Sequence, residues 1–262
     1  MFELALILAV GFGAGITTIL FGFGGGFVVV PFVYYLLSQQ PQLGHEAMHV
    51  AVATSTAVMI LTASYASYSN WRSGNILKET ITPLIYFIAI GAALGAAFSV
   101  ALADQTVRLL FIIYMVITIA DCLFRRGFLQ QPDAKAMRPT TLFLGGPVIG
   151  IVATALGVGG SVMTVPLLRR HGYAMKHCVS AANPLSIPVA LIGAGAYAFL
   201  GQGKIDAPFY LGYINVHILG LLFVAGLVGI VFAKTCLPKI NDALHAKIYV
   251  ALLFLVLIAI CL

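Results

Sequence analysis

The 262-residue chain is 61% hydrophobic and only 8% charged, which is more apolar surface than a soluble domain of this length can bury. Its formal net charge of +6 comes from scattered basic residues, without the basic stripe and interleaved aromatics of a nucleic-acid-binding surface. The composition therefore predicts an integral membrane protein and argues against a nucleic-acid partner.

Long runs without Lys, Arg, Asp or Glu follow one another along the chain, and most reach the ~20 residues that a membrane-spanning helix needs. In the first part of the chain we expect a glycine-broken segment over 1–37 and helices over 46–69, 81–103 and 107–123. In the second part we expect a glycine-broken segment over 140–169 and helices over 177–200, 208–233 and 247–262.

A glycine-rich break followed by a proline occurs in both parts. Gly22–Pro31 has the sequence GFGGGFVVVP and Gly157–Pro166 has GVGGSVMTVP, a separation of 135 residues (157 minus 22). Later pairs keep the same order, among them His49 with His177. This duplication predicts two related halves. We expect an N-terminal transmembrane repeat over 1–124, a cytoplasmic linker over 125–139 and a C-terminal transmembrane repeat over 140–262.

The basic residues predict how the halves lie in the membrane. If each broken segment crosses once, the fourteen bases divide seven and seven; if each returns to the face it entered from, only Arg108 and Lys204 lie on the poorer face. The positive-inside rule favours the second arrangement, although residues 2–20 are long enough to span unaided. The predicted fold is an all-α polytopic membrane protein with two inverted repeats, each a re-entrant or discontinuous glycine-broken segment plus three transmembrane helices. The loops 70–80, 124–139, 169–176 and 234–247 would then be cytoplasmic, with both termini outside.

Breaks at membrane depth need protein or a water-filled cavity to satisfy their backbone groups, and the helix that begins after each break would aim the positive end of its dipole into that cavity. We therefore expect an anion site without buried arginine, formed by backbone amides, hydroxyls and one amide side chain. Asn183 precedes Pro184, which predicts a helix break there. Helix packing is the alternative role for each Ser or Thr. The expected binding residues are Gly24, Gly25, Gly26, Thr54, Ser55, Gly159, Gly160, Ser161 and Asn183.

Two histidines hold matching positions near the starts of their helices. His49 and His177 are candidates for proton coupling, and helix capping or an interfacial role is the alternative. No set of residues combines a nucleophile with a base, and the four cysteines lack metal-ligand or disulfide spacing, so we expect no enzyme activity, no metal and no cofactor.

These residues resemble the TauE/SafE family of sulfite exporters, also called the toluene-sulfonate uptake permease family, over nearly the whole chain. The resemblance rests on the two glycine-proline motifs, on Ala53-Thr54-Ser55 and on Trp71-Arg72-Ser73-Gly74-Asn75. It implies transport of small sulfur-containing anions such as sulfite, sulfonates or thiosulfate. The second half departs from the family pattern at Ser161 and at Ala181-Ala182-Asn183.

We therefore expect a multi-pass secondary transporter of a bacterial inner membrane that moves a small sulfur oxyanion by alternating access. The preferred expectation is export of sulfite. Two alternatives stay open: a proton-coupled uptake permease for an organosulfonate or thiosulfate, and a non-transporting membrane scaffold. The expected partners are the small anion, sulfite or a sulfonate, and the lipid bilayer; a homo-oligomer is left open.

Overall fold

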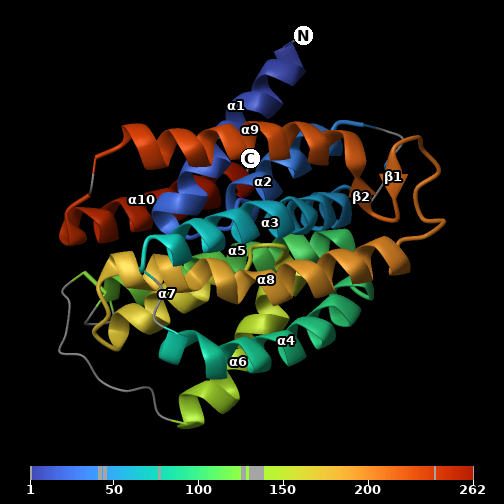
Figure 1. The fold of residues 1–262 in the computed structure, drawn as a ribbon. Coiled ribbons are helices and arrows are strands. Elements are labelled where there is room, and N and C mark those ends of the chain that lie inside the picture. The colour runs from blue at the N-terminus through green and yellow to red at the C-terminus, as the bar shows by residue number, and fades with distance from the viewer. Residues whose placement is uncertain are drawn as a thin grey trace.

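Helices make up almost all of the protein in the computed structural model, which describes residues 2–40, 43, 46–75, 78–124, 128–129, 139–238 and 240–261. The first half holds α1 (Phe2–Phe21), α2 (Gly26–Ser38), α3 (Ala47–Arg72), α4 (Lys78–Val100) and α5 (Asp104–Phe124). The second half holds α6 (Pro139–Leu156), α7 (Ser161–Arg170), α8 (Met175–Leu200), α9 (Val216–Cys236) and α10 (Asp242–Cys261). A hairpin of β1 (Tyr210–Leu211) and β2 (Ile214–Asn215) precedes α9 (Figure 1).

The all-α membrane fold is confirmed. Seven of the described helices are long and apolar enough to cross a bilayer: α1, α3, α4 from Ile81 onward, α5, α8, α9 and α10. In hydrocarbon a helix satisfies its own backbone groups, which is why apolar runs of this length adopt it. Large apolar side chains on the outer helices, such as Leu94, Ile117 and Val224, are exposed, as lipid-facing residues are. The linker expected over 125–139 lies almost wholly outside the described residues.

Both glycine-rich breaks interrupt the helices, as predicted. The first separates α1 from α2 and the second separates α6 from α7. Gly24 and Gly25 in the first break and Gly157 and Gly159 in the second have φ between 62° and 84°. Side chains with a β-carbon rarely adopt this conformation, so glycine is what allows the chain to turn there.

The two halves interlock. α3 packs against α8 in the middle of the molecule, while α1 of the first half packs on α9 of the second and α6 of the second packs on α4 of the first (Figure 1). Glycines permit both outer crossings: a β-carbon on Gly15 would lie 2.0 Å from the Gly226 carbonyl oxygen, and one on Gly91 would lie 2.1 Å from the Pro147 carbonyl oxygen. Close backbone approach at small residues is a common way to associate helices in lipid.

Contacts define two ends of the bundle. At the Asp104 end, Asp104 lies beside His49 at the start of α3, and Arg108 binds the Ile260 carbonyl near the end of α10. At the Asp242 end, Asp242 lies beside Met175 at the start of α8. α3 and α8 are therefore antiparallel.

Each broken segment turns back on itself. The last turn of α1 reaches the Asp242 end, where the Leu20 carbonyl bonds His245, and α2 runs back to place Tyr34 beside Arg108. In the second half the Ala155 carbonyl near the end of α6 bonds Ser99, and α7 runs back to the Asp242 end. These directions suit re-entrant segments, while the orientation of the halves across a bilayer stays a prediction.

Two local predictions were wrong. The helix expected over 208–233 begins only at Val216, because Phe209 and Gly212 have φ of 65° and 59° and the chain turns there into the β1–β2 hairpin. The break expected at Asn183 is absent: α8 continues through Pro184. Most of α8 is buried against neighbouring helices, and this packing overrides the local preference of the residue before a proline.

Candidate functional site

The two glycine breaks meet at the middle of the molecule through one side chain. The hydroxyl of Ser55 on α3 lies 2.9 Å from the Gly26 carbonyl oxygen and 2.9 Å from the Gly157 carbonyl oxygen, so it is shared between the first and second breaks. Gly26 must be glycine at this meeting point, since a β-carbon there would lie 2.7 Å from the Gly157 oxygen. Ser55 is fully buried.

Met59, one turn further along α3, fills the space between the breaks. A β-carbon on Gly24 would lie 2.9 Å from its sulfur, and one on Gly159 would lie 2.6 Å from the same atom. The next turn completes the first break, because the Thr62 hydroxyl donates to the Gly24 carbonyl at 2.6 Å. One face of α3 therefore satisfies the backbone of the first break.

Each break also packs against the central helix of the other half. A β-carbon on Gly22 would lie 3.0 Å from the Val179 carbonyl oxygen of α8, and one on Gly157 would lie 2.9 Å from the Val52 carbonyl oxygen of α3. Neither break can therefore move without disturbing the helix of the opposite half.

Two buried polar atoms near the breaks have no hydrogen-bond partner among the described residues: Ser161 Oγ, at the first residue of α7 in the second break, and Asn183 Oδ1 on α8. Both residues are fully buried. The Asn183 amide nitrogen donates to the Thr18 carbonyl at 3.3 Å. A buried polar group without a partner costs about 1–3 kcal/mol, so each of these atoms is expected to bind something.

Helices α2 and α7 both begin at the breaks without a side-chain cap. The first amides of a helix have no intrahelical acceptor, and the helix dipole places partial positive charge there. The uncapped start of α7, together with the Ser161 hydroxyl, offers donors that can bind an oxyanion without a cationic side chain.

The predicted donor Thr54 lies away from this centre, and the nearby hydroxyl of Ser186 is already bonded. The Thr54 hydroxyl accepts the Asn215 amide at 3.0 Å, on the side of the β1–β2 hairpin. The Ser186 hydroxyl bonds the Ala182 carbonyl of its own helix, although it also lies close to Gly159. Gly24, Gly25, Gly26, Gly159, Gly160, Ser55, Ser161 and Asn183 do lie at or beside the breaks.

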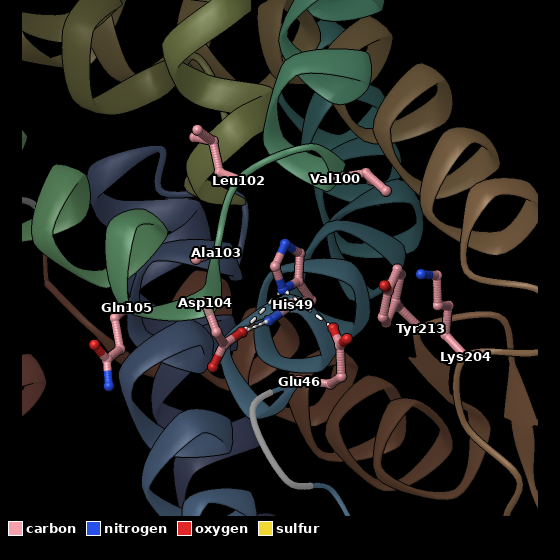
Figure 2. Close-up of a pocket in the computed structure, with 9 residues that line it drawn as sticks. All are labelled: Glu46, His49, Val100, Leu102, Ala103, Asp104, Gln105, Lys204 and Tyr213. Atoms are coloured by element: carbon pink, nitrogen blue, oxygen red, sulfur yellow. Dashed lines mark hydrogen bonds and ion pairs between the residues drawn. The ribbon is translucent and has the colours of Figure 1, made fainter.

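His49 belongs to a charged cluster in a cavity of ≈ 410 Å³ at the Asp104 end (Figure 2). Its Nδ1 lies 2.9 Å from Asp104 and 3.4 Å from Glu46, and its Nε2 lies 3.2 Å from the Ser99 carbonyl oxygen. Both ring nitrogens therefore face acceptors. Burial, together with the charge of Glu46, raises the pKa of Tyr213 to about 12, so this neighbouring phenol stays neutral at physiological pH.

His177 has different surroundings although it holds the matching position. It is half-buried, and its Nδ1 lies 3.2 Å from the Asn75 carbonyl oxygen. No carboxylate contact is recorded for it among the described residues. The structure thus separates two histidines that the sequence could not distinguish.

Two aspartates that no sequence pattern singled out hold the central helices. Asp104, the first residue of α5, accepts the amides of Met48 and His49 at 2.8 Å each. Asp242, the first residue of α10, accepts the Met175 amide at 2.8 Å and also pairs with Arg169. Each lies at the start of the last helix of its half, a repeat-related position that could have revealed them. Within the described part of the chain, no cluster of His, Cys, Asp and Glu could hold a metal ion.

Comparisons with known proteins agree with this architecture. A "Probable membrane transporter protein" of Haemophilus influenzae is 26% identical over 97% of this chain and 96% of its own length. A protein of Methanocaldococcus jannaschii, also named as a probable membrane transporter, is 24% identical over 93% of this chain and 88% of its own length. No solved structure gives a significant match. A family model described as "Sulfite exporter TauE/SafE" matches residues 7–260, so the chain belongs to the TauE/SafE family of membrane transporters.

Proposed function

We propose that the protein is a secondary transporter that carries a small sulfur-containing oxyanion, sulfite first, out of a bacterial cell across the inner membrane. The observation that carries the proposal is the buried Ser161 hydroxyl, which has no hydrogen-bond partner in the described part of the chain and lies at the uncapped start of α7. Such a group is costly unless it binds a ligand or water. A hydroxyl at the positive end of a helix is suited to an oxyanion.

Alternating access would connect this centre to each end in turn. The residues of both breaks are buried, so the structure corresponds to a closed state of the centre. A cavity with some polar side chains lies at each end: the one at the Asp104 end reaches His49 and Val100, and the one at the Asp242 end reaches Leu20 and Ser180. Ser55 holds both breaks together in this state. Movement of one half relative to the other would break this contact and open one cavity toward the centre.

The inside-negative membrane potential supplies a driving force for anion exit. One negative charge gains about 2.3 kcal/mol per 100 mV as it leaves the cell. Sulfite therefore needs no coupled ATP hydrolysis to leave. This favours export as the direction of transport.

The test is flux of radiolabelled sulfite in proteoliposomes at imposed voltages. We expect efflux that increases with an inside-negative voltage and is strongly reduced in Ser161→Ala, which removes only the hydroxyl group. Protein-free liposomes and methanesulfonate competition serve as controls. No sulfite flux at any voltage or pH would reject sulfite as the substrate, and no flux of any sulfur anion would favour the scaffold alternative.

The inverted arrangement has its own test at repeat-related loop positions. The sequence repeat also pairs Gly74-Asn75 with Gly203-Lys204. Ser73 and Gln202 precede these pairs, and both are exposed. In a cysteine-free background we expect an impermeant maleimide added to whole cells to label Gln202→Cys and to spare Ser73→Cys. Permeabilised cells should label both. Labelling of both positions in intact cells would reject the inverted arrangement.

Proton-coupled uptake of an organosulfonate or thiosulfate is the second candidate, and the His49 cluster supports it. An imidazole between two carboxylates and a carbonyl can take up a proton at one face and release it when that end opens. A pH gradient would then drive uptake of labelled thiosulfate, and His49→Gln would abolish the drive. Voltage-driven sulfite flux that is unaffected by the pH gradient would exclude this candidate.

A further inference from the structure

A cavity of ≈ 350 Å³ at the Asp242 end lies between α1, α3, α8, α9 and α10 and their adjoining loops. We call it the lysine vestibule. Its polar lining residues are Asn70, Asn75, Lys176, Ser180, Lys234 and His245. No carboxylate belongs to its described lining, and the nearby Asp242 is paired with the buried Arg169. The charge of the lining is therefore positive.

Asn70 adds a hydrogen-bond donor that the fold leaves unused. Its side chain is only 8% exposed, and its amide nitrogen has no partner among the described residues. Lys234 is held beside it, because the Lys234 ammonium donates to the hydroxyl of the adjacent Ser69 at 2.7 Å. An unpaired buried amide next to a positioned ammonium group is a site for an anion.

Two helices that line the vestibule, α3 and α8, also contact the glycine breaks. Ser180 lines the vestibule, and Asn183 follows three residues later, so the two share one face of α8. On α3, Thr62 holds the first break and Asn70 follows eight residues later, a distance of roughly 12 Å along the helix. Val179, which packs against Gly22, also lines the vestibule.

We propose that the lysine vestibule is a separate docking site for the transported oxyanion, in which Lys176 and Lys234 attract the anion and Asn70 binds it before it reaches the centre. This inference rests on the proposed anion transport and adds a second site to it. Clefts lined by one sign of charge raise the local concentration of the opposite ion and the rate of association by 10- to 1,000-fold. The same site would serve release when transport runs in the opposite direction.

The charge of the vestibule can be tested without any transport. Leu237 lines it, so Leu237→Cys in a background with Cys236→Ser and Cys261→Ser supplies a reporter; the remaining two cysteines are buried. In phosphatidylcholine nanodiscs we expect an anionic methanethiosulfonate reagent to react about tenfold faster than a cationic one of similar size. The added changes Lys176→Gln and Lys234→Gln should remove this preference. Lys204→Gln at the opposite end is the matched control and should leave it intact.

The donor role of Asn70 is tested by protection of the same cysteine. Methanesulfonate should slow its modification, and Asn70→Leu should weaken this protection about tenfold. Equal rates for the two reagents, or a preference that survives the double lysine change, would overturn the proposal. So would protection that requires phosphatidylglycerol in the bilayer and is not given by methanesulfonate, because the occupant would then be a lipid headgroup.

Measurements of sulfite transport distinguish failure of the docking site from failure of the proposed transport function. In the variant with Lys176→Gln and Lys234→Gln, Vmax/KM for sulfite should fall about tenfold in both directions of transport. The values for influx and efflux must change together, because the equilibrium constant of a passive carrier fixes their ratio. The fall should be smaller in high salt, which screens the lysine charges. A protein with anion-selective labelling but no sulfite flux would reject sulfite transport and support the docking site. Unchanged Vmax/KM beside normal wild-type flux would reject the docking site alone.

Discussion

The two glycine breaks are related in sequence but differ in how their polar groups are satisfied. At the first break, Ser55 and Thr62 of α3 hydrogen-bond the carbonyls of Gly26 and Gly24. At the second, Ser55 also bonds the Gly157 carbonyl, while the hydroxyl of Ser161 has no partner among the described residues. We therefore expect the first break to hold the closed structure together and the Ser161 hydroxyl of the second to bind a ligand.

The two halves also differ in the partners of the aspartates that hold the central helices. In the second half Asp242 pairs with Arg169, which is only 1% exposed and always charged. In the first half Asp104 lies beside His49, which can gain and lose a proton. One half therefore has a permanent ion pair where the other has a titratable one.

The largest expected effect on stability comes from substitution of the two aspartates. Asp242→Asn leaves the buried Arg169 guanidinium with carbonyl partners only, so we expect a loss toward the lower end of the roughly 3–5 kcal/mol typical of a broken buried pair. Asp104→Asn keeps an acceptor for the α3 amides and should cost about 1 kcal/mol. Thermal unfolding in detergent micelles measures both. Equal losses would show that the two ends are equivalent after all.

A second comparison concerns the space around the breaks. Gly26→Ala would place a β-carbon 2.7 Å from the Gly157 oxygen, so we expect loss of flux and about 1–3 kcal/mol of destabilisation. Gly160→Ala meets its nearest neighbours at 3.5 Å, and Gly160 has an ordinary helical φ of −67°. It should keep both flux and stability. An active, stable Gly26→Ala protein would mean that the breaks do not meet as described.

Substitution of the Ser55 and Ser161 hydroxyl groups distinguishes a structural role at the breaks from a role in binding the anion. Ser55→Ala leaves two buried carbonyls without their donor, so stability should fall by about 1–3 kcal/mol. Ser161→Ala removes an unpaired hydroxyl, so stability should stay or rise, while sulfite affinity falls about tenfold, or ~1.4 kcal/mol. Unfolding without ligand and equilibrium binding of labelled sulfite give the two readings. If Ser161→Ala destabilises the protein and binds normally, Ser161 has only a structural role.

The smallest effect is expected at the two histidines. His49→Gln should change the dependence of flux on pH between about 5.5 and 8.5 by a few fold, because His49 is a titratable group that faces Glu46 and Asp104. His177→Gln should leave the pH profile unaltered. Initial flux rates across this range provide the measurement, and identical profiles for both variants would remove His49 from the transport cycle.

Much of the fold could be predicted from local patterns. Uncharged runs of spanning length predicted the long helices, and the repeated Gly-rich motif with Pro31 or Pro166 predicted both breaks. The β1–β2 hairpin was not predicted, because Phe209 to Asn215 continues the apolar composition of a helix and only the positive φ values of Phe209 and Gly212 reveal the turn.

The candidate site was less predictable because it depends on contacts between the halves. Ser55 and Thr54 are neighbours in one polar triplet, yet Ser55 faces the breaks and Thr54 faces Asn215. Helix rotation decides this, and an apolar membrane helix gives little sign of its rotation. The lysine vestibule combines side chains from α1, α3, α8, α9 and α10 and their adjoining loops, so no local sequence motif predicts it.

The central claim is that the second break binds the transported anion at the start of α7. A structure determined by electron cryo-microscopy with and without saturating sulfite tests it most directly. We predict added density within about 2.7–3.2 Å of Ser161 Oγ and the first amides of α7. Density confined to the lysine vestibule, with the Ser161 hydroxyl still unpartnered in an actively transporting protein, would contradict the account.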